Sequence, residues 1–179
     1  TLLALSPQDE LLVVEMGMRG RGQIAALAAI AEPEVGVITN IGLAHLELLC
    51  SQEAIAEAKG ELVAALPASG TAVLNGDDAR CAALAAKTAA RVVRFGLGEG
   101  AEVKASELIE GPEGSSFILH APGGMSFPVR LNVPGRHQVQ NALAAAAAAL
   151  AVGLTPEEIQ AGLAGFGLSR GRGGSVLAP

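Results

Sequence analysis

Aromatic side chains are almost missing from this sequence. They make up 2% of the 179 residues, and there is no tryptophan and no tyrosine. The core must therefore be filled by alanine, leucine, valine and isoleucine, which suits close packing of helices on a sheet. Proteins that bind single-stranded nucleic acid usually stack its bases on aromatic side chains. Because the formal net charge of -6 also leaves no broad basic face, we expect no nucleic-acid partner.

Cysteine is scarce as well. The two cysteines, Cys50 and Cys81, are too few for a disulfide framework and lack the spacing of a metal site. A reduced, cytoplasmic protein is the expectation.

Neither a long hydrophobic run nor a leader pattern is present. The longest apolar segment, residues 142–152, is shorter than the roughly 17 to 25 residues of a membrane span. Residues 1–5 carry no basic n-region and no cleavage pattern, so we expect no signal peptide. No contact with a membrane is predicted.

The chain of 179 residues is long enough for one full core. Strand and helix signals alternate through its first half. The apolar run 11–14 looks like a buried parallel strand. Further strands are expected at 35–39, 71–74 and 92–96, with helices near 24–32, 51–66 and 81–90. This alternation predicts an α/β fold, a doubly wound and mostly parallel sheet with flanking helices.

The second half has a different pattern. Residues 117–120 and 126–133 flank a Pro-Gly-Gly turn and predict a small antiparallel satellite hairpin. Helices are expected from about 137 to 151 and from Thr155 to near Gly165. The glycine-rich, basic tail 169–179 has the composition of a linker.

Polar residues follow three of the expected strands: Glu15, the pair Thr39 and Asn40, and Asn75. In an open α/β sheet, ligands bind beyond the carboxyl ends of the strands. One polar residue at such a place is usually a turn former, but three together favour a binding site.

Lys59 lies on the apolar side of its expected helix, whereas Glu53, Glu57 and Glu61 share the opposite side. It therefore either snorkels to an edge, pairs with a buried carboxylate, or belongs to a site. A desolvated lysine would have a lowered pKa and could be modified.

Other candidates are weaker when taken alone. His45 could share a divalent cation with Glu15, although a histidine that only hydrogen-bonds within its loop is the more common case. The loop 17–22 could bind an anion at a helix N-terminus, but its G-x-x-G-x-G spacing is not the dinucleotide fingerprint. From composition, Gln138 and Asn141 would be structural.

Taken in order, these segments resemble the central domain of the Mur ligases. The motifs that carry the resemblance are Val-Glu-Met-Gly at 14–17, Thr-Asn-Ile-Gly at 39–42 with Ala-His-Leu-Glu at 44–47, Ser51 with Ile-Ala-Glu-Ala-Lys-Gly-Glu at 55–61, Asn-Gly-Asp-Asp at 75–78, and Pro-Gly-Arg-His at 134–137 with Asn-Ala-Leu-Ala-Ala at 141–145. Within the family, the pattern is most similar to the type that adds D-alanyl-D-alanine to UDP-N-acetylmuramoyl tripeptide in peptidoglycan synthesis.

The resemblance implies roles for individual residues and ATP and Mg²⁺ as cofactors. Glu15 and His45 match the magnesium ligands, and Lys59 matches a carbamylated lysine. Asn40, next to Thr39, matches the polar residue beside the γ-phosphate. Asn141 matches an asparagine that contacts adenine; Asn75 and Gln138 belong to the same nucleotide-side motifs, and Gln138 stands where the family usually has asparagine.

The implied chemistry is the attack of a peptide carboxylate on the γ-phosphate of ATP, followed by capture of the acyl phosphate by the amine of D-Ala-D-Ala. However, the sequence contains no G-x-x-G-K-[ST] phosphate loop. We therefore expect residues 1–168 to be a central ATPase domain without its N-terminal phosphate-loop part, inactive alone, and 169–179 to lead toward a missing C-terminal domain. The alternatives are another Mur-type amide ligase, such as one like folylpolyglutamate synthase, and a non-catalytic α/β module that binds a partner.

Overall fold

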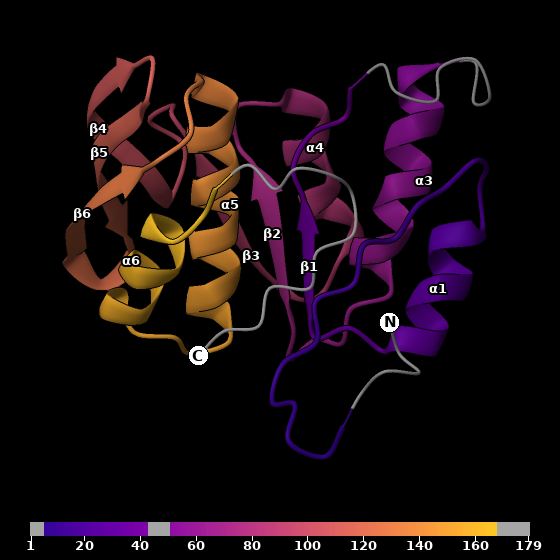
Figure 1. Cartoon of the computed structure of the whole chain (residues 1–179). Coiled ribbons are helices and arrows are strands. Elements are labelled where there is room, and N and C mark those ends of the chain that lie inside the picture. The colour runs from indigo at the N-terminus through magenta and orange to yellow at the C-terminus, as the bar shows by residue number, and fades with distance from the viewer. Residues whose placement is uncertain (1–5, 43–50, 168–179) are drawn as a thin grey trace.

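A six-stranded sheet runs through the part of the chain that the computed structural model describes, residues 6–42 and 51–167 (Figure 1). The strands lie side by side in sequence order: β1 (Val35–Ile38), β2 (Thr71–Asn75), β3 (Arg91–Gly96), β4 (Val103–Gly111), β5 (Gly114–Ala121) and β6 (Met125–Leu131). Strands β1 to β4 pair in parallel, and β5 and β6 pair antiparallel.

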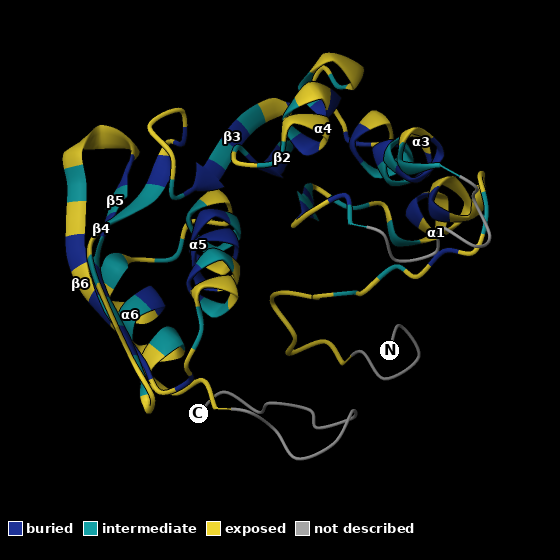
Figure 2. Cartoon of the chain, turned by 90° about the horizontal axis from the view of Figure 1, so that it is seen from above, coloured by how far each residue is buried: buried dark blue, intermediate teal, exposed yellow. Residues whose placement is uncertain are grey.

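Helices cover both faces of this sheet, and the predicted fold class is confirmed (Figure 2). On one face lie α3 (Gln52–Ala64) and α4 (Ala79–Ala83), with α1 (Gln23–Ala31) packed against α3. On the other lie α5 (Arg136–Ala151) and α6 (Pro156–Ala164), the latter against β6. We call these the α3 face and the α5 face. None of the helices in the described ranges is long and apolar enough to span a bilayer.

Two hydrophobic clusters fill the space between sheet and helices. Strand β2 separates them, because Ala72 and Leu74 contribute to the cluster of the α3 face and Val73 to that of the α5 face. All three side chains are fully buried, as expected for a parallel strand covered on both sides. Small side chains on α5, among them Ala146 and Ala147, let that helix lie close to the strands.

The predicted strand at 11–14 is wrong. These residues form no strand, and Val13 is 91% exposed. An extended segment becomes a strand only where a neighbour accepts its ladder of hydrogen bonds. Within the described ranges the sheet ends at β1, and no strand pairs with 11–14.

The expected satellite hairpin is present as β5 and β6, but it is not separate from the main sheet. Strand β4, which the sequence pattern did not predict, joins it to β3. The register of β4 against β5 shifts between Ser106 and Ile109, and Glu107 has a φ of 52°. This bulge interrupts the alternation of apolar and polar residues by which a strand is recognised.

The helix expected at 81–90 is shorter than predicted: α4 ends at Ala83 and a 3-10 turn, Leu84–Lys87, follows. The N-termini of α3 and α6 match the prediction more closely. Ser51 accepts a hydrogen bond from the amide of Ala54, and Thr155 and Glu158 form a capping box.

Candidate functional site at the carboxyl ends of the strands

Asn75 joins the carboxyl ends of β1 and β2. Its side-chain amide donates to the carbonyl of Thr39 at 2.8 Å and accepts from the backbone amide of Asp77 at 2.8 Å. The residue is 5% exposed, so both ends of its amide group are used within the chain. Asn75 therefore braces the two strand ends, while Thr39 and Asn40 beyond β1 are exposed.

Lys59 reaches from α3 to this same place. Its ammonium group donates to the carbonyl oxygen of Asn40 at 2.7 Å, on the side of α3 that also carries the fully buried Ile55 and Ala58. Of the three alternatives left by the sequence, a pair with a buried carboxylate is not found among the described residues. A lysine that snorkels to the edge of the sheet and a lysine that belongs to a site both agree with this contact. Lys59 lies at the end of β1, where the sequence placed a site.

Burial lowers the pKa of Lys59, and the negative charges of Cys81, when it is ionised, and of Asp78 offset part of that effect. A larger share of the neutral amine is therefore present near neutral pH than for a lysine in water. A neutral amine is the form that reacts with carbon dioxide, which makes Lys59 chemically suited to modification.

Asp78 holds the loop that follows β1. One carboxylate oxygen accepts from the amide of Ile41 at 2.7 Å, and the other accepts from Arg80 and Cys81 at the start of α4. This fixes the backbone next to Asn40. The sequence pattern predicts no separate role for Asp78, although an aspartate directly before a short helix is a common N-cap.

Cys81 is buried behind the same loop. Its thiol donates to the carbonyl of Ile38 at 3.2 Å and accepts from the amide of Asn75 at 3.3 Å. Burial raises the pKa of this thiol to about 11, so it stays protonated at neutral pH and acts as a packing and hydrogen-bonding group.

The glycine-rich loop 17–22 does meet an anion, but the anion belongs to the chain itself. The carboxylate of Glu61 accepts from the amides of Gly22 and Ala25, at 2.6 and 3.0 Å, at the N-terminus of α1. Glu57, which lies on α3 like Glu61, pairs with Arg21. The amides that could have held a ligand therefore hold α3 against α1.

Of the two predicted metal ligands, Glu15 lies within the described ranges. Glu15 is exposed and follows the segment that forms no strand, and His45 lies outside the described residues. No group of three His, Cys, Asp or Glu side chains within 6–42 and 51–167 is arranged to hold a metal ion. The assignment of Glu15 and His45 to Mg²⁺ stays a prediction.

Gln138 and Asn141 lie on the first turns of α5, on the other face of the sheet. The Asn141 amide is exposed and donates weakly to Gln138 at 3.4 Å. Among the described residues this is the side-chain hydrogen bond of Asn141. A structural role and a role in binding a ligand both stay predictions.

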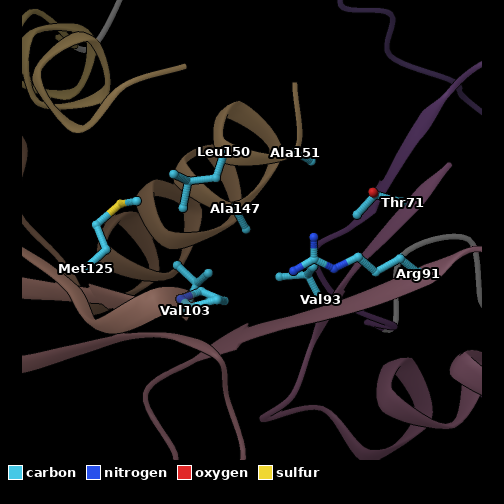
Figure 3. Close-up of a pocket in the computed structure, with 9 residues that line it drawn as sticks. Thr71, Arg91, Val93, Val103, Met125, Ala147, Leu150 and Ala151 are labelled. Atoms are coloured by element: carbon cyan, nitrogen blue, oxygen red, sulfur yellow. The ribbon is translucent and has the colours of Figure 1, made fainter. Parts of the chain in front are cut away.

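A cavity of about 190 Å³ lies at the opposite end of the strands (Figure 3). Thr71 and Arg91, at the starts of β2 and β3, line it together with Ala147 and Leu150 near the end of α5. The cavity is thus separated from Lys59 and Asn40 by the length of the sheet and does not belong to the candidate site.

The chain is similar to proteins of a known family. The family model described as the Mur ligase middle domain matches residues 1–149. The UDP-N-acetylmuramoyl-tripeptide--D-alanyl-D-alanine ligase of Mycobacterium tuberculosis is 45% identical over 164 residues, which are 91% of this chain and 32% of that protein. The chain spans about a third of the length of such relatives.

Solved structures agree with the relatives. The structure of MurF from Acinetobacter baumannii superimposes with a TM-score of 0.88 at 37% identity, covering 96% of this chain and 37% of the other. MurF from Thermotoga maritima, solved in complex with ADP, has a TM-score of 0.74 at 27% identity, covering 88% and 36%.

Proposed function

Because the chain belongs to the Mur ligases and corresponds to their middle domain, we propose that it is the ATP-binding central domain of a ligase that joins D-alanyl-D-alanine to UDP-N-acetylmuramoyl tripeptide. Relatives that carry this activity in their names support the choice of substrates. An ADP complex of a similar protein supports the nucleotide. We call the whole protein that contains this chain the complete ligase.

The observation that carries the proposal is the contact between Lys59 and the carbonyl of Asn40. It places a half-buried amine at the carboxyl end of β1, the edge of an α/β sheet at which ligands bind. Addition of carbon dioxide to the neutral amine releases a proton and leaves a carbamate, which turns a cation into an anion. Lys59 as a carbamate would thus add a negative oxygen ligand beside Asn40.

Mg²⁺ fits the donor types of the proposed set, since oxygen ligands suit it and an imidazole can complete the set. Glu15 and His45 would hold the ion together with the carbamate of Lys59. When bound, Mg²⁺ supplies neutralisation of phosphate charge. Asn40 is the residue of this chain that would lie beside the γ-phosphate.

The base of the nucleotide would lie on the other side of the site, near α5. Asn141 and Gln138 present exposed or half-exposed amide groups there, and amides can both donate to and accept from the edge of adenine. Asn75 and Thr39 would support this side by holding the ends of β1 and β2 together.

In the proposed reaction the terminal carboxylate of the UDP-linked peptide attacks the γ-phosphate of ATP, ADP leaves, and the amine of D-Ala-D-Ala captures the acyl phosphate with release of phosphate. The contribution of the protein is mainly to position the reactants. Residues 1–168 contain no phosphate-loop sequence, and Glu61 binds the amides of Gly22 and Ala25 at the N-terminus of α1. We therefore propose that this chain alone does not turn over ATP, and that 169–179 leads to a further domain.

The test is an omission assay on the complete ligase. Phosphate release should require ATP, UDP-N-acetylmuramoyl tripeptide and D-Ala-D-Ala together, and should fall to background when any one is left out. Turnover with L-alanine or with a folate and glutamate instead would assign the chain to another ligase of the family. A complete protein that uses none of these acceptors would reject the enzymatic reading in favour of a non-catalytic module.

A further inference from the structure

The carboxylate of Asp77 connects three segments at the carboxyl edge of the sheet. It follows β2, and its two oxygens accept from the backbone amides of Leu97 at 2.7 Å and Gly98 at 2.9 Å, in the turn between β3 and β4. The side chain of Gln140 on α5 donates to the same carboxylate at 3.3 Å. One charged group therefore ties β2, the β3–β4 turn and α5 together.

The turn is built to receive this carboxylate. A Cβ atom at Gly96 would lie 2.7 Å from a carboxylate oxygen of Asp77, and one at Gly98 would lie 2.9 Å from it. Only glycine at these positions lets the backbone close on the carboxylate without displacing it. Hydrogen bonds from backbone amides to an ionised acceptor are also stronger than those between neutral groups.

The same residue is linked to the brace between the strands. The backbone amide of Asp77 donates to the side chain of Asn75, which in turn donates to the carbonyl of Thr39. A continuous chain of hydrogen bonds thus leads from the end of β1 to α5. It reaches α5 at Gln140, two residues after Gln138 and directly before Asn141.

We propose that Asp77 is a positioning residue for the nucleotide base, which acts by holding the first turns of α5 and the β3–β4 turn in place around Gln138 and Asn141. This inference rests on the proposed function. We assign Asp77 no part in the phosphate chemistry, since its carboxylate binds Leu97, Gly98 and Gln140 and contacts neither Lys59 nor Asn40. Loss of the carboxylate should weaken nucleotide binding and relax the choice of base, while the chemical step keeps its rate.

The experiment measures steady-state kinetics of the complete ligase with ATP and with GTP. Asp77→Ala should raise the KM for ATP by about tenfold, because small misplacements of binding groups have large effects, and kcat should stay within about twofold. The ratio of kcat/KM for ATP to that for GTP should fall. A residue needed only for stability would lower the amount of active enzyme and leave KM and this ratio unchanged.

Two further variants keep the test decisive if Asp77→Ala does not fold. Asp77→Asn has the same size but faces one backbone amide with its own NH₂ group, so it should shift KM in the same direction. Gln140→Ala should raise KM by about two- to threefold without harm to the helix, because alanine is the best helix former. Combined with Asp77→Ala it should add nothing further, since both act on one contact.

Glu102→Ala is the matched control. Glu102 lies in the β3–β4 connection, and its carboxylate also accepts from a backbone amide, that of Arg94 in β3. The variant Glu102→Ala should leave the KM for ATP unchanged. Suppose that the wild type is active but the Asp77 and Gln140 variants have its KM for ATP and its base preference. This result would overturn the inference alone, and so would an equal shift of both quantities in Glu102→Ala. A wild type without ATP turnover would overturn the proposed function and the inference together.

Discussion

The two faces of the sheet are packed from similar side chains but differ in what borders them. On the α5 face the cluster is built around Phe95, Leu119 and Leu143, and the contact between Asp77 and Gln140 lies at its border. On the α3 face the cluster around Ile55 and Leu74 ends in a polar border made by Lys59, Asp78 and the thiol of Cys81 with their backbone partners. The α3 face thus ends at the amine proposed for the phosphate chemistry, whereas the α5 face ends at the amides of Gln138 and Asn141 proposed for the base.

The largest expected effect is that of Lys59→Ala on kcat. In the complete ligase, Lys59→Ala should lower kcat by on the order of 10³-fold, as loss of a group that places charge in an active site does. Its free energy of unfolding should change by less than about 1 kcal/mol, since one hydrogen bond to a carbonyl is lost. Phosphate release and urea unfolding measure the two quantities.

The control for that variant is Lys104→Ala, which removes an ammonium group that pairs at the surface with Glu99. It should change neither quantity measurably. If Lys59→Ala kept full activity, the α3 face would carry no chemistry and the contrast between the faces would disappear.

The next effect is on stability and concerns the α5 face. Leu143 is fully buried between α5 and the sheet, so Leu143→Ala should cost about 2 to 5 kcal/mol in the free energy of unfolding. Leu27→Ala on α1, where the side chain is 38% exposed, should cost clearly less. If urea titrations showed the same loss in the free energy of unfolding for both variants, the buried cluster of the α5 face would contribute no more to stability than the exposed Leu27.

Cys81 gives the third prediction, which depends on pH. Its pKa of about 11 in the folded chain lies above the ordinary value of 9.0, so folding favours the protonated thiol. The contribution of this thiol to the free energy of unfolding is complete below about pH 9. It falls as the pH rises to about 11, because the thiol of the unfolded chain loses its proton at a lower pH than that of the folded chain.

The measurement is the slope of the free energy of unfolding between those pH values, which should be steeper in the wild type than in Cys81→Ala. The comparison of slopes is used because the alanine variant also loses packing. Identical slopes would mean that the thiol ionises as easily in the folded chain as in the unfolded one.

The smallest effect concerns the border between α1 and α3. Glu61→Gln removes the negative charge at the N-terminus of α1 and replaces one of the two oxygens that accept from the amides of Gly22 and Ala25 by an NH₂ group. We expect a loss of about 0.3 to 1 kcal/mol and faster amide hydrogen exchange at these two residues. Glu53→Gln, whose exposed partner is Arg80, should leave that exchange unchanged, and equal acceleration in both variants would contradict the assigned contact.

Much of the fold could be predicted from the sequence because its signals are local. Pro33, Ser51 and Thr155 mark helix ends through backbone geometry and capping. The centre of β2 is an apolar run, and β3 contains Val92, Val93 and Phe95. The failures involve non-local pairing. Residues 11–14 have the composition of a strand but no neighbour in the described ranges, and the bulge at Glu107 hides the strand that joins the hairpin to the sheet.

The site divides in the same way. The position of Lys59 on the inward side of its helix follows from helical periodicity, and the structure adds its partner, Asn40. The roles of Asp77, Asp78 and Glu61 could not be predicted, because each carboxylate binds backbone amides of a segment that is distant or irregular. Sequence patterns report which side chain is present, whereas a backbone amide is the same in every residue except proline.

The central claim is that Lys59 is an inward amine placed for modification at the end of β1. ¹³C NMR of the complete ligase equilibrated with ¹³C-labelled bicarbonate tests it most directly. We expect one carbamate carbon signal in the wild type and in Lys104→Ala, and none in Lys59→Ala, whose activity short carboxylates should partly restore. A wild type without a carbamate signal, or a signal that survives Lys59→Ala, would contradict the claim.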